Sequence, residues 1–440
     1  IFAFIFVLGV LITIHEAGHF AMARFLGAPV EVFSVGFGKR IWGFEHKGTD
    51  YRLSLIPLGG YVRIIGLGPD ESDVVGEGAQ EMDLLPRWKR ALILFAGPLT
   101  NIVGAVVFVA LALMMGVEMP TYLEEPPVVG WVEPQSPADD AGILEGDVVM
   151  TVDGEAIEVW RDLEIALLTA GKGDVLLTVE RADRILEIPM IIDRESRYGF
   201  GISGIEPRLE AVIQLGPTGS SAAAAAGIEN GDLILAIDGE PVDQYYDLPR
   251  LIGPNPGKSV TIDVRRDGHP LQFTFVTRDE GGVGKIGVGP VFPTAMQKLG
   301  PIGSLRAGYV ECVRMTYQTF RVIGRLFSGK TSLKQVSGPV GIAQISGEAA
   351  RSGVHSLIML LGIISLQLGI FNLLPIPILD GGHLTIIAFE SIIRRDLPLK
   401  VKERILEVGF YLLILLMIVV LFNDVVKILP EGARQFFSRG

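Results

Sequence analysis

The sequence predicts a polytopic α-helical membrane protein that has four transmembrane helices, a membrane-associated β-hairpin and two inserted β-rich domains. The 440 residues are 49% hydrophobic, and their mean hydropathy of +0.43 is high for a soluble chain of this length. Four apolar stretches are each long enough to cross about 30 Å of hydrocarbon. Between the second and third stretches lies a long acidic segment that contains an internal repeat.

The four apolar stretches predict transmembrane helices at residues 1–24, 91–117, 354–379 and 405–424. Only the first carries a cluster of ionisable side chains near its middle. The alternative for this stretch is a signal peptide, but it has no basic n-region and no small-residue cleavage site. Because the sequence begins at Ile1, we expect a few residues upstream of it.

Basic residues set the expected orientation in the membrane. Nine Lys and Arg residues lie between Arg24 and Arg90, around the loop 25–90, and five more lie between Arg394 and Arg404. Residues 118–291 carry 31 acidic and 13 basic residues, a net charge of -18 against -12 for the whole chain. Because Lys- and Arg-rich loops stay in the cytoplasm, we expect the acidic segment and both termini on the opposite side of the membrane. No basic stripe suggests nucleic-acid binding.

The acidic segment contains two copies of one pattern. Residues 141–157 read AGILEGDVVMTVDGEAI, and residues 226–242, 85 positions later, read AGIENGDLILAIDGEPV. Short alternating runs broken by Gly-Asp and Asp-Gly turns predict two β-rich modules, at 124–206 and 207–291. The pattern resembles a bacterial PDZ domain, which implies capture of peptide C-termini at a sheet edge. The alternative is that one or both grooves are filled and the modules serve as spacers.

Residues 292–350 follow the second copy and predict an amphipathic surface region. Apolar residues from Leu305 to Leu326 recur at helical spacing with arginines between them, which is typical of a helix at a membrane surface. The only cysteine, Cys312, lies in this region. A single cysteine excludes an intrachain disulfide, and we expect Cys312 to be a packed small residue.

The first apolar stretch contains the motif HEAGH at residues 15–19. On a helix His15 and His19 share one face, so their ring nitrogens can converge on one tetrahedral ion, while Glu16 lies beside that face as a base. This HExxH pattern is typical of metalloproteases, and ionisable groups within a membrane are costly and usually functional. The alternative is a structural pair of histidines hydrogen-bonded between helices.

A third ligand is expected at the end of the third stretch, in NLLPIPILDGGH at residues 372–383. The metzincin extension is excluded because Met22 and Phe25 occupy its Gly and His positions. Asp380 is a carboxylate at the end of a long uncharged run, beside a backbone that two prolines interrupt. His383 is the competing candidate, and we expect it at headgroup level or behind the ligands.

The cytoplasmic-side loop contains YRLSLIPLGGYVRI, residues 51–64, which predicts two strands around a turn at 57–60. A reentrant hairpin here offers a sheet edge to an unwound substrate, with Gly59, Gly60 and Tyr61 beside it. The alternative is a hairpin that only packs beneath the second span.

Together, HEAGH, FAGPLTN at residues 95–101, the tandem copies and N-x-x-P-x-P-x-L-D-G resemble the bacterial site-2 proteases of the regulator of sigma E protease type. The resemblance covers essentially the whole chain. It implies a location in the bacterial inner (cytoplasmic) membrane, with the two modules and both termini in the periplasm and the active site within the membrane toward the cytoplasmic side. It implies one Zn²⁺ held by His15, His19 and Asp380, with Glu16 as the catalytic base. It also implies substrate contacts beyond the hairpin, at Asn101, Asn372, Pro375 and Pro377.

The predicted function is therefore a zinc-dependent intramembrane endopeptidase that cuts single-span membrane proteins after a first cleavage has removed their outer domain. An anti-sigma factor as substrate and the clearance of remnant signal peptides are implied by the resemblance alone. The alternatives are a non-catalytic PDZ adaptor with a structural metal and a metal-dependent transporter, although four spans without a repeated half disfavour the transporter. Turnover that depends on Glu16 distinguishes the protease from both.

Overall fold

The computed structural model describes residues 2–67, 85–193, 196, 201–216, 221–328 and 337–428. The chain forms two compact units. The first unit combines the residues before Glu118 with those after Met296, and the second unit is Glu118–Met296. The predicted tail 425–440 begins inside a helix that continues to Ile428, and its remainder lies outside the described residues.

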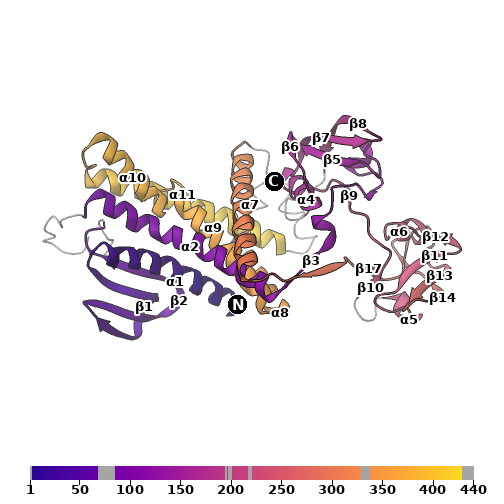
Figure 1. Cartoon of the computed structure of the whole chain (residues 1–440), viewed down its shortest axis with the longest axis horizontal. Helices are drawn as coiled ribbons and strands as arrows, with labels where there is room; N and C mark the ends of the chain where they lie inside the picture. Colours follow the sequence, from indigo (N-terminus) through magenta and orange to yellow (C-terminus); the bar gives the residue numbers. More distant parts are fainter. Residues whose placement is uncertain are drawn as a thin grey trace. The chain divides into compact units, whose positions relative to one another are not determined.

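Four helices of the first unit are long and apolar enough to cross a membrane, which confirms the four-span prediction. They are α1 (Phe2–Phe25), α2 (Arg87–Met115), α9 (Val354–Leu373) and α11 (Leu399–Ile428). Helix α2 packs against both α1 and α9, and Figure 1 shows the three running alongside one another. A Cβ atom at Gly362 or Gly369 of α9 would press on α2, so glycine lets these two helices approach closely.

The third and fourth spans differ from the predicted ranges. Helix α9 ends at Leu373, not at residue 379, because Pro375 and Pro377 interrupt the helical hydrogen bonds. A helix that we did not predict, α10 (Asp380–Ile393), then occupies most of the loop before α11. Helix α11 starts six residues before the predicted 405, and this first turn and a half includes Lys402, which forms an ion pair with Glu390 of α10.

A buried ionic cluster joins α2, α10 and α11 at one end. Glu390 is fully buried, and it accepts from Lys402 Nζ at 2.6 Å and from the Leu397 backbone N–H at 2.9 Å. Arg90, only 5% exposed, lies 3.9 Å from the same carboxylate. The two basic loops that we predicted on the same membrane side thus meet around one carboxylate.

The hairpin consists of β1 (Val30–His46) and β2 (Thr49–Ile64), so the predicted turn at 57–60 is wrong. The chain reverses at Lys47 and Gly48, both with positive φ as a two-residue hairpin turn requires. Pro57 and Gly59 instead lie within the single strand β2, at the place where the register of its pairing with β1 shifts. A proline followed by glycines indicated a turn locally, but here it marks an irregular bend.

This bend folds the hairpin into a small sheet. Residues 32–35 pair with residues 60–63 on one side and with residues 50–53 on the other. Residues 60–63 have no other strand partner among the described residues, so they form a free edge of the sheet. Figure 1 shows this sheet beside α1.

Two further helices, α7 (Pro301–Phe327) and α8 (Pro339–Ser352), occupy the predicted surface region. Cys312 is buried against apolar residues of α2 and α9, as expected for a packed small residue. The large apolar side chains that recur at helical spacing along α7 are, in contrast to Cys312, largely exposed: Leu305, Tyr317 and Phe320 are each more than half exposed. Helix α7 therefore packs through its small residues, such as Gly308 against α2, and leaves its large apolar side chains outward.

The second unit contains the two repeated β modules, and their sheets have the same strand order, β6-β5-β7-β8 and β12-β11-β13-β14. The first module comprises η2 (Thr121–Glu124), β4 (Trp131–Val132), α3 (Pro137–Asp140), β5 (Val148–Val152), β6 (Glu155–Ala156), α4 (Trp160–Ala170), β7 (Gly173–Arg181), β8 (Arg184–Ile192) and β9 (Ile205–Glu206). The second comprises β10 (Ile213–Leu215), α5 (Ala222–Ala225), β11 (Leu233–Ile237), β12 (Glu240–Pro241), α6 (Asp247–Ile252), β13 (Ser259–Arg266), β14 (His269–Val276), β15 (Arg278–Glu280), β16 (Val283–Lys285) and β17 (Val288–Pro290). Strands β3 (Val117–Pro120) and β18 (Thr294–Gln297) pair where the chain enters and leaves this unit. Each module has its own apolar core, so the internal repeat is a structural repeat; its PDZ assignment stays a prediction.

One buried ion pair recurs in both modules. The Arg181 guanidinium donates to both carboxylate oxygens of Asp147, at 2.6 and 2.7 Å, and to the Gly142 carbonyl. Arg266 makes the same bonds to Asp232, at 2.8 and 2.7 Å, 85 residues later. The repeated Gly-Asp dipeptide therefore supplies a fully buried carboxylate whose arginine partner comes from the third strand of the sheet order.

We expect Asp232→Asn to destabilise the protein by about 2 kcal/mol at pH 7, because it leaves the Arg266 guanidinium without its buried partner. Arg266 holds the pKa of Asp232 below its ordinary 3.8, so this stabilisation is present above that pH and is lost as the pH falls through the folded pKa. Thermal unfolding in detergent micelles should therefore show a gap between wild type and variant that narrows below pH 4. The exposed Glu210→Gln change in the same module is the control, and an equal loss there would contradict the assignment.

Candidate active site

Three side chains that could ligate a metal converge where α1 meets the start of α10. His15 Nε2 lies 3.1 Å from Asp380 Oδ2, His19 Nε2 lies 3.5 Å from Asp380 Oδ1, and the two Nε2 atoms are 3.1 Å apart. His15 is 8% exposed and His19 6%. The i, i+4 spacing predicted the two rings on one helical face. The helical spacing does not place Asp380, which the tertiary fold brings to the two histidines.

The donor set fits a zinc ion. One ligand atom from each of the three residues lies within 4.8 Å of the other two, so a single ion can reach all three. Two imidazoles and one carboxylate, with a fourth position open, are typical of catalytic zinc sites. His19 Nδ1 lies 2.8 Å from the Ile93 carbonyl and donates to it, which leaves the lone pair on Nε2 facing the other ligands.

Asn101 supports the other imidazole. It is fully buried on α2, and its amide lies 3.2 Å from His15 Nδ1, while its Oδ1 has no hydrogen-bond partner among the described residues. A histidine that ligates through Nε2 carries its proton on Nδ1 and needs an acceptor there. A half-turn of the Asn101 amide presents Oδ1 as that acceptor, so the orphaned oxygen fits a metal-bound His15.

Glu16 lies beside the three candidate ligands without belonging to their group. Its carboxylate is near enough to His15, His19 and Asp380 to interact electrostatically with all three, and the Val62 backbone N–H is within hydrogen-bonding reach. A Cβ atom at Gly60 would lie 3.5 Å from Glu16 Cγ. The free edge of the hairpin sheet therefore passes directly beside this carboxylate.

The segment between α9 and α10 holds Asp380 in place through a strained turn. The Leu379 N–H bonds the Ile376 carbonyl across Pro377 and Ile378, and Ile378 has a φ of 87°. This is a type II turn in which a β-branched residue takes the position that glycine normally occupies. Cβ atoms at Gly381 or Gly382 would overlap the backbone of this segment, so glycine alone permits the close approach.

The other predicted site residues lie around this centre in different ways. The Tyr61 hydroxyl accepts from Arg52 Nη1 at 3.2 Å, and the Tyr61 ring stacks on Phe37 beside Gly59. Asn372 is half-buried at the end of α9, with no hydrogen bond to its side chain among the described residues. Pro375 is exposed, and Pro377 packs closely on Gly409 of α11. His383 lies in the first turn of α10, outside the three-residue group.

Sequence reasoning missed two residues that position His19, namely Gly97 and Ile93. A Cβ atom at Gly97 would overlap His19 Nε2, and the Ile93 carbonyl bonds the opposite ring nitrogen. FAGPLTN contains Gly97, so the motif did mark the segment without indicating its role. Nothing in the sequence indicated Ile93, because it acts through its backbone.

Two histidines on an apolar helix long enough to span a membrane, together with Asp380 at the start of α10 and Glu16 beside them, define a membrane metalloprotease. The model of "Peptidase family M50" matches residues 3–416. The chain belongs to this family, whose members are zinc-dependent proteases.

Relatives span nearly the whole chain. The regulator of sigma-E protease RseP of Escherichia coli (strain K12) is 36% identical over 96% of this chain and 97% of its own length. Protease RseP of Yersinia pestis is 33% identical, also over 96% of this chain and 97% of its own length. A relative from Vibrio cholerae, whose name describes a zinc metalloprotease, is 33% identical over 97% of this chain and 98% of its own.

We expect Gly97→Ala to weaken zinc binding by about 10- to 100-fold, because the added methyl group displaces the His19 ring from its ligating position. Metal content of the purified variant, measured after dialysis against graded zinc concentrations, gives this value without an activity assay. Gly104→Ala on the same helix is the matched control, since a Cβ there meets nothing closer than 3.7 Å. Equal zinc content in both variants would rule out the role given to Gly97.

Proposed function

We propose that this zinc metalloprotease is an intramembrane endopeptidase that hydrolyses a peptide bond within the transmembrane segment of single-span membrane proteins. The observation that carries the proposal is the position of the candidate site. Both histidines and Glu16 belong to α1, a helix apolar and long enough to cross a membrane. Buried ionisable groups at such a depth are costly, and a catalytic role accounts for their retention.

In this proposal His15, His19 and Asp380 hold the metal, and Glu16 is the catalytic base. Zinc, when bound, supplies Lewis acidity that polarises the scissile carbonyl and acidifies a water molecule. Glu16 accepts a proton from the attacking water and later passes it to the leaving amine. The hydrogen bonds of His19 to Ile93 and of His15 to Asn101 keep both rings oriented throughout.

The free edge at residues 60–63 gives the substrate a place to unwind. A transmembrane helix hides its carbonyls in its own hydrogen bonds, so hydrolysis requires an extended segment whose backbone groups find other partners. An edge strand provides such partners, and its Val62 N–H is within reach of Glu16. We therefore propose that Gly59, Gly60 and Tyr61 align the substrate strand, with Asn372, Pro375 and Pro377 lining its path. Asn101, expected at first to contact substrate, is fully buried against His15 and orients that ring instead.

The two β modules are proposed to be periplasmic PDZ-like domains that exclude bulky outer domains, so that cleavage follows a first cut by another protease. The basic loops that meet around Glu390 support a common cytoplasmic side for the opposite ends of the helices. Relatives named regulators of sigma-E protease support an anti-sigma factor as substrate. Remnant signal peptides are a second proposed substrate, and the bacterial inner membrane is the proposed location.

We expect Glu16→Gln to lower the cleavage rate by about 10²- to 10⁴-fold while the protein keeps its zinc, because only proton transfer is lost. The assay uses purified full-length chain in detergent and a tagged single-span substrate without its outer domain, with metal content measured on the same samples. Glu45→Gln, an exposed carboxylate on β1, is the control.

Equal cleavage by wild type and Glu16→Gln would contradict the assigned mechanism. If zinc is bound and no single-span substrate is cut, the chain is better described as a PDZ adaptor with a structural metal. Membership of a peptidase family does not favour that adaptor.

A further inference from the structure

A cleft of about 540 Å³ opens between the two β modules. None of its lining residues belongs to the helices that carry the three candidate metal ligands. We call it the inter-module cleft. Its lining comes from the first module, from the linker at Pro207 and Arg208, and from the start of α6 in the second module. About 300–1,000 Å³ is the usual range for small-ligand pockets, so the cleft holds more than a single side chain.

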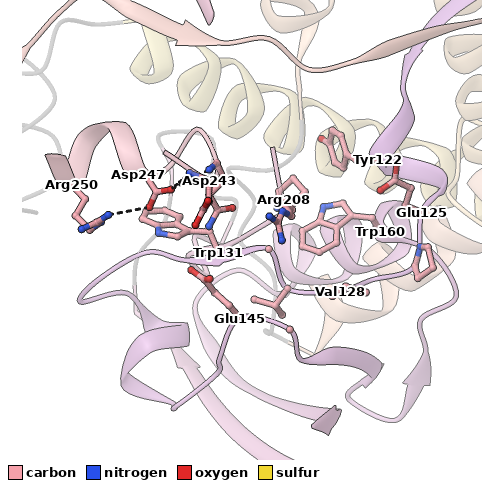
Figure 2. Close-up of a pocket in the computed structure, with 16 residues that line it drawn as sticks. Tyr122, Glu125, Val128, Trp131, Glu145, Trp160, Arg208, Asp243, Asp247 and Arg250 are labelled. Atoms are coloured by element: carbon pink, nitrogen blue, oxygen red, sulfur yellow. Dashed lines mark hydrogen bonds and ion pairs between the residues drawn. The ribbon is translucent and has the colours of Figure 1, made fainter. Parts of the chain in front are cut away.

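The lining combines indole rings with carboxylates. Trp131 and Trp160, two of only four tryptophans in the chain, flank Arg208 in Figure 2. The acidic side chains of the lining are Glu125, Glu145, Asp243 and Asp247. Trp131 stacks flat on Tyr246 of the second module, with ring centroids 4.6 Å apart, so the aromatic wall crosses from one module to the other.

The charges of the cleft do not cancel. Arg250 is neutralised, since it pairs with Glu240 at 3.0 Å and with Asp247 at 3.5 Å. The other charged residues of the lining are Arg208 and the carboxylates Glu125, Glu145 and Asp243, and none of the described residues forms an ion pair with the Arg208 guanidinium. The excess of carboxylates gives the cleft a negative potential, which attracts cations and repels a free carboxylate.

Two further observations agree with this potential. Burial, together with the nearby carboxylates Glu164 and Glu206, raises the pKa of Tyr122 at the cleft wall to about 12. Gln244 lines the cleft with only 8% exposure, and its buried Oε1 has no hydrogen-bond partner in the described part of the chain. A buried acceptor without a donor is costly, and a ligand that brings N–H groups would satisfy it.

We infer that the inter-module cleft is a peptide-binding site for an internal segment of basic and apolar residues, separate from any groove that captures a C-terminus. Basic side chains pair with Glu145 and Asp243 and pack on the indole rings. Apolar side chains fill the part lined by Pro126, Val128 and Val129. Because both modules contribute walls, an occupant bridges them and stabilises the stack of Trp131 on Tyr246.

The apolar part of the lining favours a peptide over a simple polyamine as the ligand. A polyamine would pair with the carboxylates but would leave Val128 exposed to water. The inference is independent of the catalytic proposal, because binding needs neither zinc nor Glu16.

The test uses the full chain in detergent micelles and follows tryptophan fluorescence and calorimetry. The probe is an acetylated and amidated hexapeptide of alternating arginine and leucine. Three comparison ligands are the same peptide with glutamate for arginine, the same peptide with a free carboxylate, and spermidine. We expect the capped basic peptide to bind at least 10-fold more tightly than each comparison ligand except the free-carboxylate form, which should bind more weakly by a few-fold.

Two variants should change the affinity in opposite directions. The double change Glu145→Gln with Asp243→Asn should weaken binding of the basic peptide about 10-fold, whereas Arg208→Gln should strengthen it a few-fold by removing a competing cation. Asp174→Asn and Arg184→Gln, exposed residues outside the lining, are the matched controls. Melting curves for every variant exclude unfolding as the cause.

Three outcomes would overturn the inference. Equal binding of the glutamate peptide would remove the charge argument, and equal binding of spermidine would leave only a site for small cations. Tighter binding of the free-carboxylate peptide than of the capped peptide, lost in Arg208→Gln, would indicate a carboxylate-binding groove instead.

Discussion

The close approach of α1 to α2 is the constraint on which the metal site depends. A Cβ atom at Gly18 of α1 would overlap Thr100 and the Ala96 carbonyl of α2, and one at Gly97 would overlap His19. Helices in a membrane gain little from burying apolar surface against each other, so they associate through small residues that let their backbones meet. Here the same small residues also bring Asn101 and the Ile93 carbonyl within hydrogen-bonding distance of the two imidazoles.

The sequence predicted the parts of this site that are local and left out those that depend on packing. HEAGH fixes two ligands and Glu16 through helical spacing alone. Asp380 was expected because it is the first charge after a long apolar run, and the structure does bring it to the histidines. The supporting atoms of Ile93 and Gly97 could not be identified, because a backbone carbonyl and a missing side chain leave no chemical pattern.

The fold was predictable to a similar extent. Apolar length gave the four spans and an 85-residue repeat gave the two modules, since both are properties of continuous sequence. The hairpin turn was placed at Pro57 to Gly60 because those residue types usually end strands. Its true position at Lys47 and Gly48, and the second pairing of residues 32–35, depend on contacts between strands that the local pattern does not contain. Helix α10 was missed because two prolines shortly precede it and a pair of glycines lies in its first turn, and both residue types usually interrupt helices.

Helix α10 explains why the strain at Ile378 persists. An unfavourable φ at a β-branched residue costs about 1–3 kcal/mol and survives only where the surroundings fix the backbone. At one end of α10, Gly381 and Gly382 lie tight against the preceding turn, and Pro377 is held by Gly409 of α11. At the other end Glu390 forms an ion pair with Lys402 and lies close to the Arg90 guanidinium. Packing at one end of α10 and the buried ion pair at the other fix the position of this helix, and with it the position of Asp380 beside His15 and His19.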